Sequence, residues 1–286
     1  MPDRQTAVYN STGKLKRVLL GKPTYNRILP ISDVARDLHD SDPELDAKIR
    51  DSQHAELEQV FIEQGIEIGW IDVSPDYGWQ ASTRDVGVNT PHGVLLGRFR
   101  YTERKGEEIM AKASLEKLGE TVLPRQIEKG CVEGGDCFWL DKDTLIIGNG
   151  NRSTLAGVED ARDIMSEYGK RVFVVEFLSK WNHFDIILQP VAEKLALVCE
   201  DAVPDYFIGF LDALGWERIM LPGEYAFKCE INVFALGDDK VISWRGNRVN
   251  DILKAHGLEV FDPEFSYFCA QGIGPHCSTL ELEREP

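Results

Sequence analysis

The apolar and polar positions of the chain repeat in an order of helix, glycine and short strand. Five stretches with helical spacing each end just before a glycine, where a left-handed C-terminal cap favours that residue. An apolar run typical of a short strand follows each glycine. The glycines are Gly65, Gly119, Gly169, Gly215 and Gly257, and the predicted strands cover residues 66–73, 120–124, 170–177, 216–222 and 258–262.

Between each predicted strand and the next helix, the sequence indicates a β-hairpin. The four hairpins cover residues 85–99, 137–148, 185–199 and 232–244. A fifth hairpin has no partner in sequence order. Residues 16–23 near one end of the chain and residues 277–282 near the other end both resemble unpaired strands, so we expect these two segments to pair and to close a ring.

The predicted fold is therefore α/β, with five ββαβ units arranged around an axis. Each unit of such a ring covers the apolar face of its neighbour, so we expect residues 1–286 to form a single domain. An open α/β sheet with irregular repeats is the alternative. Ser41 and Asp42 precede Pro43, a combination that predicts the start of a helix.

Composition and charge limit the functional classes. The chain has 286 residues, of which 43% are hydrophobic and 28% charged, and its formal net charge is −16. A globular protein with this charge repels phosphate backbones, so we expect no nucleic-acid partner. We find no apolar run long enough to span a membrane and no signal peptide, so we expect a cytoplasmic protein. We expect no disulfides, because the chain is large and has no secretion signal, and no structural zinc site, because the six cysteines form no CxxC pair.

Polar residues recur at the starts of the predicted hairpins, which meet at one end of the axis in a ring of this kind. Packing alone does not explain why carboxylates, an imidazole and a thiol occupy equivalent positions in different units. These positions are Arg84-Asp85, Glu133-Gly134-Gly135-Asp136, His183-Phe184-Asp185, Asn232 and His276-Cys277.

This set of groups predicts attack by a thiolate on an electrophilic carbon bonded to nitrogen. Cys277 is the predicted nucleophile, and His183 the predicted proton carrier because its ordinary pKa lies near neutrality. Glu133 is expected to orient the imidazole. Asp85 and Asp185 are expected to bind a planar cation, since paired carboxylates form forked hydrogen bonds with a guanidinium.

Four motifs resemble the guanidine-modifying pentein superfamily, which includes arginine deiminases, dimethylarginine dimethylaminohydrolases, arginine dihydrolases and amidinotransferases. The motifs are TRDV at 83–86, EGGD at 133–136, HFD at 183–185 and PHCSTL at 275–280. The resemblance spans nearly the whole chain and implies a five-bladed pseudo-symmetric α/β propeller. It also implies that no metal or organic cofactor is needed, that the partner is a small guanidino substrate, and that a homodimer is an expected assembly.

The resemblance assigns roles to individual residues. Cys277 resembles the nucleophile that forms a covalent amidino-thioether, His183 the acid and base, and Glu133 its carboxylate partner. Asp85 and Asp185 resemble the guanidinium ligands, and Arg152 resembles an arginine that binds the α-carboxylate. Arg98, Arg100 and Arg104 form a second basic cluster from which the sequence selects no single ligand; we place Arg98 and Asp136 among the substrate-binding candidates.

The favoured function is hydrolysis of an arginine-like guanidino compound to a ureido product and ammonia or an alkylamine. An amidinotransferase is the second candidate, because water and an acceptor amine compete for the same intermediate. Glu133 favours the hydrolase, since the transferases have a different acidic motif at that position. The third candidate is an arginine-binding propeller without catalysis, a role for which the set of Cys277, His183 and Glu133 is unnecessary.

Overall fold

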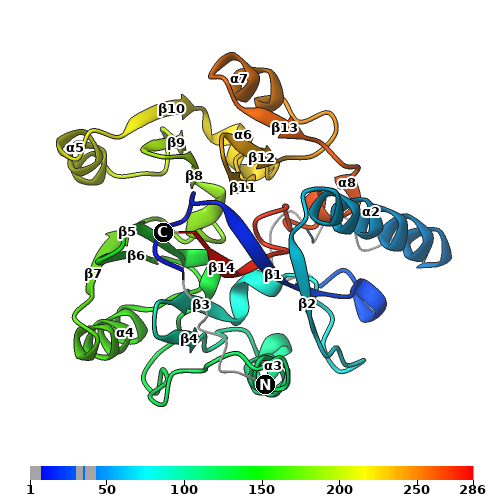
Figure 1. The fold of residues 1–286 in the computed structure, drawn as a ribbon, viewed down its shortest axis with the longest axis horizontal. Helices are drawn as coiled ribbons and strands as arrows, with labels where there is room; N and C mark the ends of the chain where they lie inside the picture. The colour runs from blue at the N-terminus through cyan, green and yellow to red at the C-terminus, as the bar shows by residue number, and fades with distance from the viewer. Residues whose placement is uncertain (1–7, 30–34, 36–42, 286) are drawn as a thin grey trace.

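The computed structural model describes residues 8–29, 35 and 43–285. The predicted N-cap residues Ser41 and Asp42 lie outside these residues, whereas the helix that follows them begins at Pro43. The described part of the chain has an α/β fold with five small sheets. Figure 1 shows these sheets around the middle of the molecule, with the larger helices toward the outside.

Four of the sheets share one arrangement: an antiparallel pair of strands, one of which also pairs in parallel with a third strand. The third strand follows a helix in each case, as the sequence predicts. These sheets are β14-β1-β2 (Leu280–Arg284, Leu15–Gly21, Glu67–Ile71), β5-β6-β7 (Cys137–Asp141, Thr144–Asn149, Arg171–Glu176), β8-β9-β10 (Leu188–Ala192, Leu195–Cys199, Glu217–Leu221) and β11-β12-β13 (Phe234–Gly237, Lys240–Ile242, Glu259–Phe261).

The fifth sheet contains only β3 (Gly87–Thr90) and β4 (Gly93–Leu96). A single parallel bridge between Val94 and Val122 replaces the strand predicted over residues 120–124. The backbone N–H of Leu96 donates to the side chain of Gln126 at 2.7 Å instead of to a neighbouring strand. Pro124 also lacks the N–H that a longer strand would use. Both features limit the pairing to one bridge.

Glycines end the five long helices as predicted. The helices are α2 (Pro43–Glu63), α3 (Glu107–Lys117), α4 (Leu155–Glu167), α5 (Asp205–Ala213) and α7 (Val249–Ala255). The glycine that follows each helix has a φ between +67° and +87°, a conformation that other residues adopt only with strain. Among the described residues, no helix is long and apolar enough to cross a membrane.

The two ends of the described chain meet in one sheet. β1 pairs antiparallel with β14, and Leu19 lies opposite Leu280. Figure 1 shows β1 in blue next to β14 in red, near the middle of the molecule. The segment that contains Cys277 leads directly into β14, so this pairing fixes the thiol next to strands from the other end of the chain.

Three short 3₁₀ turns bring the polar motifs together. η2 (Thr83–Val86) precedes β3, η4 (Gly134–Asp136) precedes β5, and η5 (Phe184–Ile186) precedes β8; η4 contacts both of the others. A Cβ atom at Gly134 would overlap the carbonyl oxygens of Arg84 and Gly87. The glycine of this motif therefore allows the turns to approach closely, which places their neighbouring polar side chains in one site.

Candidate active site

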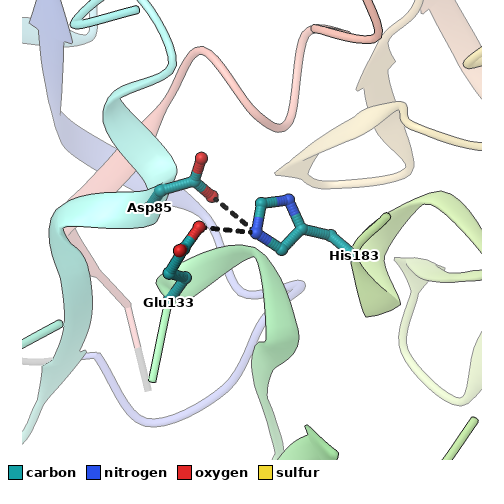
Figure 2. Close-up of side chains that lie close together, drawn as sticks. All are labelled: Asp85, Glu133 and His183. Carbon is teal, nitrogen blue, oxygen red and sulfur yellow. Dashed lines mark hydrogen bonds and ion pairs between the residues drawn. The ribbon is translucent and has the colours of Figure 1, made fainter. Parts of the chain in front are cut away.

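His183 lies between two buried carboxylates. Its Nε2 atom is 3.0 Å from Oε2 of Glu133 and 3.6 Å from Oδ1 of Asp85, as Figure 2 shows. The three side chains come from η5, η4 and η2 or from the residue directly before them, and each is at most 3% exposed. A Cβ atom at Gly135 would lie 2.8 Å from Oδ1 of Asp85 and 3.0 Å from the His183 ring. The motif thus leaves just enough space for the imidazole.

This arrangement favours an imidazolium. Burial disfavours a charged His183, but the Asp85 charge and the hydrogen bond to Glu133 outweigh burial and raise the pKa of His183 to about 9. Burial likewise disfavours ionised Glu133, yet Arg152 and His183 lower the pKa of this carboxyl to about 2. The pair is therefore ionic near pH 7, and His183 carries a proton that it can donate.

Arg152 is fully buried against the same carboxylate. Its Nη1 atom lies 3.3 Å from Oε2 of Glu133, and its Nε donates to Oδ1 of Asn182 at 3.1 Å. The guanidinium also stacks on the ring of Tyr101 at 4.5 Å. Nη1 and Nη2 have no hydrogen-bond partner among the described residues, so both groups can still donate to an anion.

Asp85 has one occupied oxygen and one open oxygen. Its Oδ2 accepts hydrogen bonds from Arg104 and, at 3.0 Å, from Ser82, whereas its Oδ1 has no hydrogen-bond donor among the described residues. Burial opposes ionisation, but the charges of His183 and Arg104 lower the pKa of Asp85. Asp85 is therefore an ionised carboxylate whose Oδ1 faces the imidazolium of His183 at 3.6 Å and accepts no hydrogen bond from the described residues.

Cys277 is held next to the second aspartate of the site. Its Sγ lies 3.4 Å from Oδ2 of Asp185, and its backbone N–H donates to Oδ1 of Asn232 at 3.0 Å. Asn232 in turn donates to the carbonyl of Asp185 at 3.3 Å. Burial and the charges of Asp185 and Asp85 raise the pKa of the thiol well above its ordinary value. Cys277 is consequently a protonated thiol at neutral pH when no cation is bound.

The remaining two predicted residues occupy different positions. Asp136 accepts hydrogen bonds from the backbone and side chain of Ser153 at 3.0 and 2.6 Å and from the backbone of Phe184 at 2.8 Å, so both of its oxygens bind protein groups. It holds the segment that carries His183. Arg98 is exposed, and its guanidinium binds the carbonyl of Glu128. Asp136 therefore supports the site from outside, and the guanidinium of Arg98 binds a carbonyl away from Asp85.

Arg104 is the arginine of the basic cluster whose side chain contacts Asp85, whereas the side chain of Arg98, one of the candidates, binds the carbonyl of Glu128. The backbone N–H of Arg100 also donates to Oε1 of Glu133 at 3.0 Å. Arg104 is fully buried and binds Asp85, the carbonyl of Ser82 and, through three hydrogen bonds of 2.7 to 3.2 Å, Glu107. The signal in the sequence is the spacing of Arg104 and Glu107, which predicts an ion pair on one face of a turn.

The donor atoms of Asp85, Glu133 and His183 lie within 4.8 Å of one another, a spacing that also suits a metal ion. However, the guanidinium of Arg152 contacts Glu133 and that of Arg104 contacts Asp85. A divalent cation at this position would face both of these positive charges. The charge distribution therefore favours the imidazolium of His183 as the cation that these carboxylates bind.

Comparison with known proteins finds a family match over part of the chain. Residues 77–197 match the family model of arginine deiminase. An uncharacterized Bacillus subtilis protein, YkgA, is 25% identical over 98% of this chain and 96% of its own length. An arginine deiminase from Listeria monocytogenes is 23% identical over 71% of this chain and 60% of that enzyme.

A solved structure shares the fold. The N-terminal domain of ArgZ, a cyanobacterial arginine dihydrolase bound to its product, superimposes with a TM-score of 0.80 and 23% sequence identity, over 95% of this chain and 98% of that one. The family match, the relatives and this likeness together confirm the resemblance that the four motifs indicate.

Proposed function

This chain has the fold of the pentein superfamily and an arginine deiminase match over residues 77–197, and we propose that it is a cysteine-dependent hydrolase of an arginine-like guanidino compound. One observation carries the proposal. The carboxylates of Asp85 and Asp185 are buried, and Oδ1 of each has no hydrogen-bond partner among the described residues. The protonated His183, which binds Glu133, lies 3.6 Å from Oδ1 of Asp85. The thiol of Cys277 lies 3.4 Å from Oδ2 of Asp185. This set combines a nucleophile, a proton donor and ligands for a cation.

The open oxygens suit a guanidinium group. Oδ1 of Asp85 and Oδ1 of Asp185 are buried and have no hydrogen-bond donor among the described residues. A buried acceptor without a donor is unfavourable, and a guanidinium supplies several N–H donors in one plane. We therefore assign Asp85 and Asp185 to the guanidinium end of the substrate.

A cationic substrate also activates the nucleophile in this proposal. The negative charges of Asp185 and Asp85 raise the pKa of Cys277, and a bound guanidinium would offset both of them. The thiol then loses its proton to solvent, and the thiolate attacks the central guanidinium carbon. His183 donates its proton to the leaving nitrogen, which departs as ammonia or an amine and leaves an amidino-thioether on Cys277.

The second half of the reaction uses His183 as a base. The neutral imidazole removes a proton from water, the hydroxide adds to the amidino carbon, and the C–S bond breaks to release the ureido product and the Cys277 thiolate. Glu133 stabilises the imidazolium that forms again at this step. All atoms of the products come from the substrate and one water molecule.

Arg152 is our candidate for the other end of the substrate. Its buried Nη1 and Nη2 groups have no hydrogen-bond partner among the described residues, and a carboxylate can accept from both. We further propose that the five sheets are blades of a propeller closed by the pairing of β1 with β14, so that residues 1–286 act as one catalytic domain.

Mass spectrometry of product mixtures tests the function. The purified protein is incubated with arginine, methylated arginines, agmatine, guanidinoacetate or hydroxyarginine, with and without glycine or lysine as an amine acceptor. The variant Cys277→Ala is the control; we expect it to lose turnover and still bind the substrate in calorimetry. A ureido product that forms without acceptor supports the hydrolase, product that requires acceptor indicates an amidinotransferase, and binding without turnover of any compound indicates a silent binder.

A further inference from the structure

His276 shares an oxygen of Asp185 with the nucleophile. Nδ1 of His276 lies 2.8 Å from Oδ2 of Asp185, and Sγ of Cys277 lies 3.4 Å from the same atom. The other oxygen, Oδ1, has no hydrogen-bond donor among the described residues, and all three side chains are buried. The two donors thus occupy one oxygen and leave the other open.

The backbone around this contact is fixed on both sides. Asn232 accepts from the N–H of Cys277 at 3.0 Å and donates to the carbonyl of Asp185 at 3.3 Å, so one amide connects the two segments. A Cβ atom at Gly274 would overlap this amide. The His276 ring also packs against Phe234, with 5.9 Å between ring centroids. The contact between His276 and Asp185 is therefore part of a rigid arrangement.

The charges around the ring favour a neutral imidazole with its proton on Nδ1. Arg84, which forms a buried ion pair with Glu281, acts against a charge on His276, whereas Asp185 and Glu281 favour it. Burial and Arg84 dominate and lower the pKa of His276. Because an ionised carboxylate only accepts hydrogen bonds, the single proton of the neutral ring lies on Nδ1.

We propose that His276 is a positioning residue that holds the Asp185 carboxylate with Oδ2 toward Cys277 and Oδ1 open toward the substrate guanidinium. The substrate part of this statement rests on the proposed function; the effect on the thiol does not. Without the Nδ1–H donor, the carboxylate can rotate and lose the orientation of its open oxygen. The carboxylate also becomes a stronger acceptor for the proton of Cys277, because one competing donor is gone.

Three variants test the role of His276. His276→Ala removes the donor, and His276→Asn retains an N–H near the position of Nδ1. His256→Ala is the matched control, because the side chain of His256 is exposed and its Nδ1 binds only the backbone of its own helix, at Ile252. Each variant is compared with the wild type in a thermal unfolding scan, in steady-state kinetics and in the pH dependence of Cys277 alkylation by iodoacetamide.

We expect His276→Ala to raise KM for the guanidino substrate at least tenfold, with a smaller change in kcat, and to move the alkylation profile to higher pH. We expect His276→Asn to restore both properties most of the way and His256→Ala to change neither. An unchanged alkylation profile in a folded His276→Ala protein overturns the proposal, as does a His276→Asn protein that is no better than the alanine variant. If the wild type converts no guanidino compound but the profile still shifts, the proposed function fails and the positioning role stands.

Discussion

The substitution Glu133→Gln tests the electrostatics of the site most directly. The structure holds the pKa of His183 at about 9, against an ordinary value of 6.5, although burial alone would lower it. A difference of about 2.5 units corresponds to about 3 kcal/mol in favour of the imidazolium. Two unit charges about 4 Å apart interact by about 4 kcal/mol at an effective dielectric constant near 20. Because Asp85 and Asp136 also favour the imidazolium and remain in place, the loss of Glu133 is expected to lower the pKa of His183 by at least one unit and not to abolish its elevation.

The assay is an NMR titration of isotopically labelled imidazole groups, which needs no substrate. We expect the wild-type resonance of His183, assigned with His183→Asn, to titrate near pH 9 and the Glu133→Gln resonance to titrate at least one unit lower. The matched control is Glu58→Gln, because Glu58 forms a similar pair with the buried His54 at 2.7 Å. If His183 still titrates near pH 9 in Glu133→Gln, the stated cause of its charge is wrong.

Thermal unfolding provides an independent check of the same ion pair. A histidine whose pKa is raised in the folded state contributes stability that is complete below pH about 6.5 and lost as the pH rises through about 9. We therefore expect His183→Asn to lower Tm more at pH 6 than at pH 10. An equal loss at both pH values would indicate that packing, and not charge, dominates the role of His183 in folding.

Three further predictions follow from single contacts. Gly135→Ala places a methyl group against Asp85 and His183, so we expect activity to fall more than tenfold, while Gly209→Ala, at a helix position with no atom within 4 Å of the new Cβ, keeps its activity. Equal activities would contradict the packing argument. Arg152→Met should raise KM for arginine far more than for agmatine, which lacks a carboxylate; equal effects would exclude the carboxylate role. A saturating guanidinium ligand should move the pH profile of Cys277 alkylation to lower pH, and an unchanged profile would exclude activation by substrate.

The repeating elements are predictable from the sequence because local chemistry determines them. A glycine at the end of each long helix adopts a left-handed conformation, and four of the five following runs form a strand. The run at 120–124 forms a single bridge, because Pro124 lacks the backbone N–H that a longer strand would use and the side chain of Gln126 accepts the hydrogen bond of Leu96. The side chain of Gln126 accepts a hydrogen bond that a strand would otherwise accept, and such a contact has no counterpart in the alternation of apolar and polar residues.

The motif residues of the site are predictable, but their charge partners are not. EGGD and HFD lie at hairpin starts, and the 3₁₀ turns bring Glu133 and His183 together. Arg104 and His276 reach the site through tertiary contacts with Asp85 and Asp185. Sequence spacing indicates which residues share a helix, strand or turn. Which of the neighbouring arginines contacts Asp85 depends on the direction of each side chain, and the folded backbone determines that direction.

In both Asp85 and Asp185, one carboxylate oxygen accepts hydrogen bonds from the protein and the other accepts none from the described residues. This difference explains how the site can keep its arrangement without a ligand and still have acceptor atoms for a cation. Arg104 occupies Oδ2 of Asp85, and His276 occupies Oδ2 of Asp185, so each carboxylate keeps a fixed orientation in the unliganded protein. Each Oδ1 is left without a hydrogen-bond donor, which costs stability. In the proposed function, a guanidinium bound between them would remove this cost at both positions. The proposal therefore predicts that the cost of the two unpaired oxygens becomes affinity for the charged end of the substrate, next to Cys277.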